Sequence, residues 1–295
     1  MEKVSICIPT YGKAEYVKQL LDSIFRQTYS DFEIIITDDT QGDEVKRVAI
    51  SYQDERIHYY HNAQKLGHIF NWNKAIELAT GEYIKIMFSD DWFTYENSLE
   101  QYVDLLERQP GVDFAFSGSM QVSSQESYAR IIPDDFILSL KNDYRYLFTG
   151  NLAGAPSGTI FRNRGIFFDE KSNWGSDLEL YLHLLSENPN FAVSVEPLVS
   201  IGLHGEQYTN MFKKRDMRIF NDYFFMFRKY NLIENPDCRA YFEKMMLEYG
   251  KGVMFARRAG YSGRDYRKQK IMYLWKNKVL DYVDAGKRKL NGIKN

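Results

Sequence analysis

VSICIPTYGKAEYVKQLLDSIFRQTYSDFEIIITDD, residues 4–39, decides the fold class of this 295-residue chain. It holds two apolar runs of strand type, VSICIPT and FEIIIT, on either side of a segment whose apolar residues recur at helical spacing. The second run stops at Asp38 and Asp39. A strand, a helix and a strand in this order predict a parallel βαβ unit.

The alternation continues along the chain. Further strands are expected at RIHYYH (56–61), EYIKIMF (82–88) and DFAFSGS (113–119), and further helices at DEVKRVAISYQ (43–53), FNWNKAIELAT (70–80) and LEQYVDLLERQP (99–110). The predicted fold class is therefore α/β, a mostly parallel sheet flanked by helices. Ligands of such sheets bind beyond the carboxyl ends of the strands, so polar residues that follow the strands mark the candidate site.

Composition indicates a globular chain. Aromatic residues reach 16%, which suits core packing and interfaces first and sugar-stacking surfaces second. Cys7 and Cys238 are too distant for a metal motif or a disulfide framework, which favours a reducing cytoplasmic compartment. We expect no signal peptide and no transmembrane helix, because no window approaches the roughly 20 apolar residues of a membrane span.

Charge is distributed unevenly. Residues 1–205 contain 17 Lys and Arg against 30 Asp and Glu, whereas residues 206–295 contain 21 against 10. We therefore expect a domain over residues 1–205 and a basic, aromatic-rich helical region over residues 206–295. Its segment FARRAGYSGRDYRKQKIMYLWKNK (255–278) fits a solvated helical face, an interfacial helix on anionic lipid, or a homodimer contact. No nucleic-acid recognition motif accompanies the charge, so no nucleic-acid partner is expected.

Paired carboxylates follow two of the expected strands. Asp90 and Asp91 close the strand EYIKIMF, as Asp38 and Asp39 close FEIIIT. Aspartates often begin turns, so one interpretation is structural. The functional interpretation is a Mg²⁺ or Mn²⁺ site at Asp90 and Asp91, completed by a diphosphate, with Asp39 accepting hydrogen bonds from a base or ribose. PTYGK is neither a GxGxxG fingerprint nor a P-loop, which argues against dinucleotide oxidoreductases and P-loop kinases.

The order of these motifs resembles the family 2 inverting glycosyltransferases, which adopt the GT-A fold. The similarity lies in residues 4–39, in NAQKLGHIFNWNKAIELATGEYIKIMFSDDWF (62–93), and in PSGTIFRN and FFDEKSNWGSDLELYLHL. It spans about residues 3–205 and leaves the basic region uncovered. The resemblance implies transfer of a sugar of hexosyl type from a nucleoside diphosphate donor, UDP on family grounds, to a hydroxyl of a glycan or lipid-linked acceptor in cell-surface polysaccharide assembly.

The resemblance also implies roles for particular residues. It assigns nucleotide binding to Thr10, Tyr11, Asp39, Lys65, Asn73 and Asp90, binding of a divalent metal (Mn²⁺ or Mg²⁺) to Asp91 and His204, and general-base catalysis to Asp177. Structural interpretations stay open: an acid such as Asp177 is also favoured in the first turn of a helix, and a lone histidine is more often structural than a ligand.

Two positions depart from the family pattern. Phe88 stands where the family's acidic motif begins with Asp, and Trp72 stands where many members carry Arg, a role that Lys65 could fill. Strict metal dependence is therefore left open. Two other functions remain in view: a non-catalytic scaffold subunit that binds nucleotide sugars, and a nucleotidyltransferase. The expected location is cytoplasmic, with peripheral attachment to the inner face of the plasma membrane.

Overall fold

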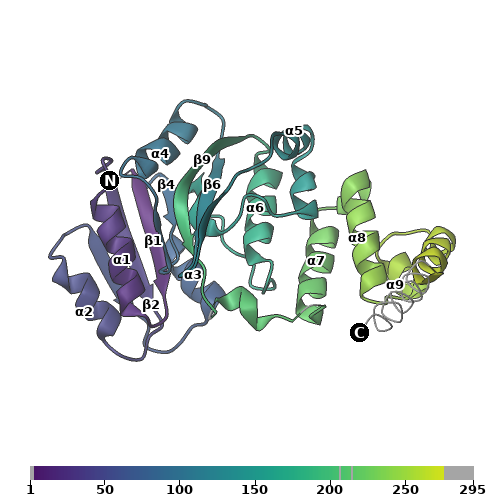
Figure 1. Ribbon diagram of the computed structural model, residues 1–295, viewed down its shortest axis with the longest axis horizontal. Helices are drawn as coiled ribbons and strands as arrows, with labels where there is room; N and C mark the ends of the chain where they lie inside the picture. The colour runs from purple at the N-terminus through teal and green to yellow at the C-terminus, as the bar shows by residue number, and fades with distance from the viewer. Residues whose placement is uncertain (1–2, 206, 214, 276–295) are drawn as a thin grey trace, which may run out of the picture. The chain divides into compact units, whose positions relative to one another are not determined.

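The computed structural model describes residues 3–205, 207–213 and 215–275 (Figure 1). The chain divides into two compact units, Met1–Lys213 and Lys214–Asn295. The first unit thus extends a few residues past position 205, where the charge distribution predicted a boundary.

The first unit is an α/β domain, as the sequence predicted. Its strands are β1 (Val4–Thr10), β2 (Phe32–Asp38), β3 (Ile57–His61), β4 (Tyr83–Ile86), β5 (Asp91–Phe93), β6 (Phe114–Val122), β7 (Ser127–Arg130), β8 (Thr159–Arg162) and β9 (Phe191–Gly202). Its helices are α1 (Ala14–Phe25), α2 (Glu44–Ser51), α3 (His68–Glu77), α4 (Ser98–Glu107), α5 (Asp134–Asn142) and α6 (Ser176–Glu187), with 3-10 turns η1 (Tyr144–Thr149), η2 (Pro156–Gly158) and η3 (Tyr208–Met211).

The strands form one sheet in the order β3-β2-β1-β4-β8-β6-β9-β5, with β7 beside β6. The pairs β1–β2, β1–β4 and β2–β3 are parallel, as predicted. Beyond β4 the sheet is mixed, because β8 runs antiparallel to both β4 and β6. Antiparallel neighbours need no crossover helix, and the elements directly before β8 are the 3-10 turns η1 and η2.

Parallel pairing brings the ends of the first strands to one edge of the sheet. Thr10 lies opposite Asp38 in the register of β1 and β2, and Asp38 lies opposite His61 in that of β2 and β3. We call this the strand-end edge. It is where ligands bind in sheets of this type.

Helices cover both faces of the sheet. On one face, alternate residues of β1 such as Ile6 and Ile8 join a buried apolar cluster with α1, α2 and α4 (Figure 1). On the other face α3 lies so close that the Cys7 thiol donates to the carbonyl oxygen of Ala75 at 3.4 Å. A fully buried Leu or Ile contributes about 1.5–3 kcal/mol, so this packing holds the strand ends in place.

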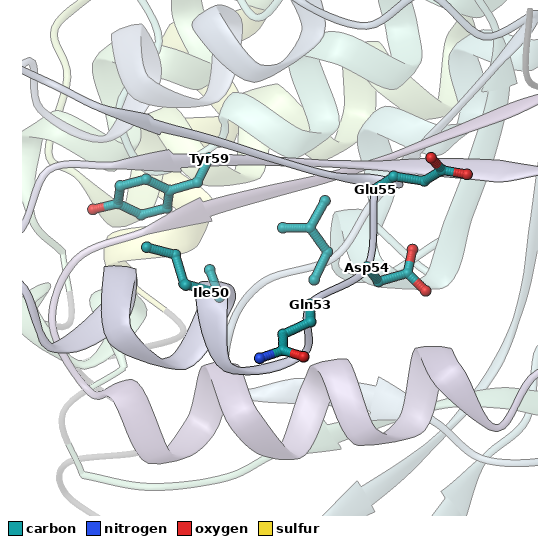
Figure 2. A pocket seen from close by; sticks show the side chains of 7 residues that line it. Ile50, Gln53, Asp54, Glu55 and Tyr59 are labelled. Carbon is teal, nitrogen blue, oxygen red and sulfur yellow. The ribbon is translucent and has the colours of Figure 1, made fainter.

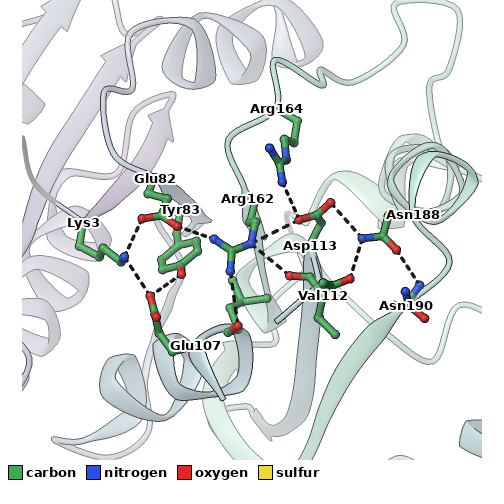
Figure 3. A network of polar contacts seen from close by, with 12 residues as sticks. Lys3, Glu82, Tyr83, Glu107, Val112, Asp113, Arg162, Arg164, Asn188 and Asn190 are labelled. Atoms are coloured by element: carbon green, nitrogen blue, oxygen red, sulfur yellow. Dashed lines mark hydrogen bonds and ion pairs between the residues drawn. The ribbon is translucent and has the colours of Figure 1, made fainter. Parts of the chain in front are cut away.

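The opposite edge of the sheet is held by charge pairs (Figure 3). Lys3 Nζ lies 2.6 Å from Glu82 and 2.9 Å from Glu107. Arg162 pairs with Glu82 and, at 3.3 Å, with Asp113. These hydrogen bonds and cations hold the pKa values of all three acids below their ordinary range. The ion pairs at the opposite edge therefore stabilise the fold.

The second unit is helical in the residues that the structure describes. It contains α7 (Met217–Lys229), η4 (Leu232–Glu234), α8 (Pro236–Glu248), α9 (Val253–Arg258) and a helix over residues 263–275. The sequence predicts a helix over AYFEKMMLEYGKGVMFARR (240–258), and the structure interrupts it at Gly250, whose φ of 66° ends α8. The sequence also predicts a helix at YRKQKIMYLWKNKVLDYV (266–283), and the part of this prediction after residue 275 lies outside the described residues. Within the described part of the chain, no helix is both long and apolar enough to cross a bilayer.

Candidate active site

The strand-end edge is built around the buried carboxylate of Asp38. It accepts hydrogen bonds from the Thr10 hydroxyl at 2.9 Å, from the Thr40 backbone N–H at 2.9 Å and from the Tyr59 hydroxyl at 2.6 Å. The side chain of Thr10 is thus directed at Asp38. These bonds tie the ends of β1, β2 and β3 together, so Asp38 positions the edge.

Asp39 holds the loop that enters α3. Its carboxylate accepts from Asn62 Nδ2 at 2.7 Å and from the backbone N–H groups of Leu66 and Gly67 at 3.0 and 2.8 Å. A carboxylate offers about four lone-pair sites, so one remains for a ligand N–H or hydroxyl.

Tyr11 and Lys65 form the outer part of this edge. The Tyr11 side chain is 63% exposed, and Lys65 Nζ lies 3.6 Å from the centre of its ring. A cation over an aromatic face is a favourable contact, and both residues are next in sequence to partners of Asp39, since the Asp39 N–H donates to the Thr10 carbonyl and the Leu66 N–H donates to the Asp39 carboxylate. The structure therefore brings three of the predicted nucleotide-binding residues together.

Asn73 is directed elsewhere. Its amide donates to the Phe168 carbonyl and accepts from the Phe168 N–H, both at 2.9 Å, which binds α3 to the segment before α6. A second asparagine of α3, Asn71, supports the strand ends instead, donating to the carbonyls of Thr10 and Thr37 at 3.2 and 3.1 Å. The sequence pattern did not single out Asn71, whose place beneath the strand ends depends on tertiary burial, and the role predicted for Asn73 stays a prediction.

Asp90 and Asp91 have different surroundings. Asp90 is partly exposed, and its Oδ2 lies 2.8 Å from His204 Nε2. Asp91 is 3% exposed and accepts from the Gly202 N–H at 3.2 Å and from the Ser157 hydroxyl. Burial and the charge of Asp90 raise the pKa of Asp91 well above its ordinary value. Asp90 therefore faces the solvent side with His204, whereas Asp91 lies beneath it.

The site residues fit a divalent cation at Asp90 and His204. The two side chains converge, since His204 Nε2 lies 2.8 Å from Asp90 Oδ2 and is the ring nitrogen that would face a shared cation. The described residues hold no group of three or more His, Cys, Asp or Glu side chains placed to bind a metal. Mg²⁺ and Mn²⁺ commonly take one or two protein ligands together with substrate phosphates, so a diphosphate would complete this donor set.

Lys85 is a buried cation that sequence reasoning missed. It has no exposed surface on β4, it donates to the Ser157 carbonyl, and its Nζ lies 4.3 Å from the centre of the Tyr102 ring. Burial lowers its pKa well below the ordinary value. Ser157 Oγ also accepts from the Phe88 N–H at 2.9 Å. Lys85 and Ser157 together hold the turn that carries the two aspartates.

Asp177 lies in the first turn of α6, as predicted. Its carboxylate accepts from Asn151 Nδ2 at 2.8 Å and from the Leu178 N–H at 2.8 Å. The side chain is half-buried, and its protein surroundings raise the pKa of Asp177 to about 6. A carboxylate with this pKa is mostly ionised at neutral pH and close to the optimum for a general base.

One segment, 151–157, links the two acidic groups. It begins at Asn151, which binds Asp177, and it ends at Ser157, which binds Asp91. Pro156 starts the 3-10 turn η2 that places Ser157. The segment therefore sets the position of Asp177 relative to the aspartate pair.

The two departures from the family pattern contact one another. The rings of Trp72 and Phe88 lie 4.8 Å apart, and Phe168 lies 5.0 Å from Trp72. Aromatic pairs at this spacing are stabilising, so packing replaces an Arg and an Asp at these positions. The aromatic cluster supports the turn before Ser89 and Asp90.

A separate hollow lies away from this site, between α2 and the edge strand β3 (Figure 2). Its volume is about 420 Å³, and it is lined by Ala49, Ile50, Gln53, Asp54, Glu55, Ile57 and Tyr59. Asp54 is already paired with Arg56 at 2.9 Å. The strand-end edge gathers more of the residues with functional chemistry, so it remains the candidate active site.

Comparisons with known proteins identify the family of this chain. Residues 5–168 match the model of glycosyl transferase family 2. The putative colanic acid biosynthesis glycosyl transferase WcaA of Escherichia coli K12 is 30% identical over 236 residues, which are 77% of this chain and 81% of WcaA. The chain spans 66% and 34% of the lengths of two Rickettsia glycosyltransferases that it also matches.

Solved structures support the same fold. TarS of S. aureus in complex with UDP-GlcNAc aligns over 84% of this chain and 71% of that chain, with a TM-score of 0.62 and 17% identity. The Pyrobaculum calidifontis mannosyltransferase PcManGT, in complex with GDP-Man and Mn²⁺, aligns over 93% and 84%, with a TM-score of 0.56 and 16% identity. The fold is thus that of the GT-A glycosyltransferases. The chain belongs to glycosyl transferase family 2.

Proposed function

We propose that this chain is an inverting glycosyltransferase of hexosyl type that moves a sugar from a nucleoside diphosphate donor to a hydroxyl of a glycan or lipid-linked acceptor, in cell-surface polysaccharide assembly. The observation that carries the proposal is the segment 151–157, which joins the carboxylate of Asp91 to that of Asp177. The donor sugar and the acceptor hydroxyl would meet between the aspartate pair and Asp177. The relative WcaA is named for the biosynthesis of colanic acid, which supports a role of this chain in polysaccharide assembly.

Donor binding begins at the outer part of the strand-end edge. Tyr11 offers an exposed ring for a nucleobase, and the remaining lone pair of Asp39 accepts from the base or ribose. Lys65 supplies a positive charge at the same place. The UDP-GlcNAc complex of TarS supports UDP as the donor nucleotide.

The diphosphate would lie at Asp90 and His204. We assign the metal ligands to these two residues in place of the Asp91 and His204 pair expected from the sequence, since Asp91 is buried beneath them. A bound Mn²⁺ or Mg²⁺ offsets the negative charge that develops on the departing diphosphate. Asp91, held by Ser157 and Gly202, keeps the Asp90 turn in position.

Asp177 would act as the general base. An inverting transfer needs a base that removes the proton of the acceptor hydroxyl as its oxygen attacks the anomeric carbon from the face opposite the leaving nucleotide. The Asn151 amide and the Leu178 N–H fix the orientation of the carboxylate. Holding both substrates in this arrangement supplies much of the rate enhancement.

The nucleotide assignment is tested by thermal melting with UDP, GDP, CDP and dTDP, each with and without Mn²⁺. A ligand at about 100 times its dissociation constant stabilises the folded state by about 2.7 kcal/mol, so one nucleotide should raise the melting temperature of the wild type. The Mn²⁺-dependent part of this shift should disappear in Asp90→Asn and persist in Asp113→Asn, the matched control from the opposite edge. No shift with any nucleotide would overturn the donor assignment.

Turnover separates the enzyme from the two alternatives. Release of UDP from a UDP-sugar by the purified chain identifies a transferase. Binding without turnover in any acceptor mixture would favour the scaffold subunit, for which the aromatic contact of Trp72 with Phe88 is the supporting observation. Pyrophosphate release from a nucleoside triphosphate would favour a nucleotidyltransferase.

The composition of the helix over residues 263–275 favours binding of the chain to an anionic membrane surface. Tyr266 is buried, while Ile271, Met272, Leu274 and Trp275 are between 55% and 72% exposed. Exposed cations precede them on the same helix, at Arg264, Arg267 and Lys268. Cations beside exposed apolar residues fit the headgroup region of anionic lipid. We propose a cytoplasmic protein held peripherally at the inner face of the plasma membrane.

Vesicle sedimentation tests this attachment. The chain should sediment with vesicles of phosphatidylcholine and phosphatidylglycerol but not with phosphatidylcholine alone. Trp275→Ser should abolish sedimentation with these vesicles. Tyr128→Ser also removes an exposed aromatic side chain, on β7, and should sediment as the wild type does. Equal sedimentation of all three proteins would contradict the attachment, and a concentration-dependent dimer that Trp275→Ser dissociates would assign the helix to a homodimer contact.

A further inference from the structure

Arg130, the last residue of β7, has no role in the proposed reaction so far. Its side chain is half-buried, and Nη2 donates to the carbonyl oxygen of Asn151 at 2.9 Å. In the described part of the chain this is its one side-chain hydrogen bond, and no carboxylate there forms an ion pair with it. A guanidinium has five N–H donors, and a buried arginine is ordinarily paired with an acid.

The chain makes room for this guanidinium at Gly154. The glycine has a φ of 85°, and a Cβ at this position would collide with Arg130 Nη1. The same glycine accepts a hydrogen bond from the Tyr181 hydroxyl at 3.1 Å, so α6 holds the loop in place. Gly154, in its left-handed conformation, leaves space for the guanidinium, and the Asn151 carbonyl accepts a hydrogen bond from it. We call this space the slot.

The slot lies beside the proposed base. Asn151 connects the two groups, since its carbonyl accepts from Arg130 and its amide donates to Asp177. Asp177 is close enough that the positive charge lowers its pKa against the larger effect of burial. The carboxylate of Asp177 is already held by Asn151 and Leu178, so the remaining donors of Arg130 are available to another group.

We propose that Arg130 binds an anionic group of the acceptor, a carboxylate or a phosphate, next to the hydroxyl that Asp177 activates. This inference rests on the proposed function and adds the chemical class of the acceptor. The planar guanidinium matches both anions with paired hydrogen bonds. A brace for the loop would need a single N–H, whereas Arg130 makes one hydrogen bond and keeps further N–H donors beside Asp177.

The test uses the full chain loaded with UDP and Mn²⁺, so that anions cannot enter the nucleotide site. Calorimetric titration with methyl β-D-glucuronide, glycerol 3-phosphate and the neutral methyl β-D-glucoside compares carboxylate, phosphate and no charge. The variants are Arg130→Gln and Gly154→Ala. Arg164→Gln is the matched control, because it removes the same charge from an exposed ion pair with Asp113 at the opposite edge.

At least one anionic probe should bind the wild type and Arg164→Gln about tenfold more tightly than Arg130→Gln, as expected for the loss of charge-assisted hydrogen bonds. Gly154→Ala should weaken the same probe. The preferred probe then assigns the anion as a sugar carboxylate or a phosphate. Equal binding by wild type and Arg130→Gln, or no preference of the wild type for either anion over the glucoside, would overturn the inference.

UDP binding in the same samples keeps the two proposals apart. Arg130→Gln should bind UDP as tightly as the wild type, since Arg130 lies on the acceptor side. A wild type that fails to bind UDP contradicts the proposed function, whereas normal UDP binding without anion binding contradicts this inference alone.

Discussion

The two edges of the sheet use the same acidic residue types in opposite ways. At the opposite edge, Glu82, Glu107 and Asp113 meet lysine or arginine, and their pKa values lie below the ordinary range. At the strand-end edge, burial raises the pKa values of Asp91 and Asp177. At the opposite edge, ion pairs and hydrogen bonds outweigh the effect of burial, whereas for Asp91 and Asp177 burial outweighs the nearby charges of Lys85 and Arg130.

The difference separates stability from function. A compensated acid stabilises the folded state at neutral pH, whereas a buried acid with a raised pKa destabilises it once ionised. Residues with shifts of the second kind are concentrated at functional sites, where they meet ligands. Under the proposed function, Asp177 meets the acceptor hydroxyl and Asp91 lies beneath the proposed cation site.

The largest expected effect is the loss of catalysis in Asp177→Asn. Removal of a general base should lower the transfer rate by about 10²–10⁴-fold. Donor affinity should be unchanged, because Asp177 lies on the acceptor side. Initial rates of UDP release and UDP titration measure the two quantities, and an active Asn variant would remove Asp177 from the mechanism.

Asp113→Asn is the control for this variant. The two substitutions should change the melting temperature in opposite directions. Its transfer rate should match the wild type, but its melting temperature should fall because the pairs with Arg162 and Arg164 are lost. Asp177→Asn should melt higher than the wild type at pH 7.5. The folded-state pKa of about 6 lies above the ordinary 3.8, so ionised Asp177 costs up to about 3 kcal/mol above pH 6.

Changes at the proposed metal ligands come next. Asp90→Asn and His204→Ala should each lower the Mn²⁺-supported rate by about 10²-fold, consistent with loss of charge stabilisation at the leaving group. Chelation with EDTA should lower the wild-type rate and leave the variants little changed. Arg164→Gln, far along the sheet, should behave as the wild type. Variants as active as the wild type at every Mn²⁺ concentration would contradict the assignment.

The pH profile should show a smaller, graded effect. Because Asp177 must be ionised to act, kcat/KM should fall about tenfold per pH unit below the pKa of about 6 and level off above it. The fall occurs on the acidic side, since protonation removes the base. A profile that stays flat down to pH 4.5 would indicate an ordinary carboxylate pKa or another base.

The smallest effect on activity belongs to the opposite edge. Arg162→Gln should destabilise the fold by about 1–3 kcal/mol, because it leaves Glu82 and Asp113 without their shared cation. The transfer rate per folded molecule should stay within twofold of the wild type, an order-of-magnitude expectation for a site distant from the chemistry. Urea unfolding and initial rates measure both. A large loss of rate in this variant would break the comparison between the edges.

Local patterns made much of this account predictable. Apolar runs with helical or strand periodicity predicted β1, α1 and β2, and paired acids after strands predicted where Asp39 and Asp90 lie. The position of Asp177 in the first turn of α6 follows from an amphipathic run preceded by a polar turn. These features depend on near neighbours in the sequence.

Other features depend on distant partners and carry no local pattern. Lys85 lies within an apolar strand, and its partner Ser157 belongs to a segment 72 residues away. Arg130 and Asn151 meet only because β7 and the loop before β8 fold together. The roles of the two neighbouring aspartates also depended on tertiary burial, since one faces His204 and the other faces inward.

Carboxyl carbon-13 NMR of the chain labelled at its aspartates tests the central claim most directly. Asp177→Asn and Asp113→Asn assign the two signals, and one pH titration then reports both pKa values in the same sample. The account predicts a midpoint near 6 for Asp177 and a midpoint below the ordinary 3.8 for Asp113. Midpoints for both residues close to 3.8 would contradict it, because the two edges would then hold their acids in the same way.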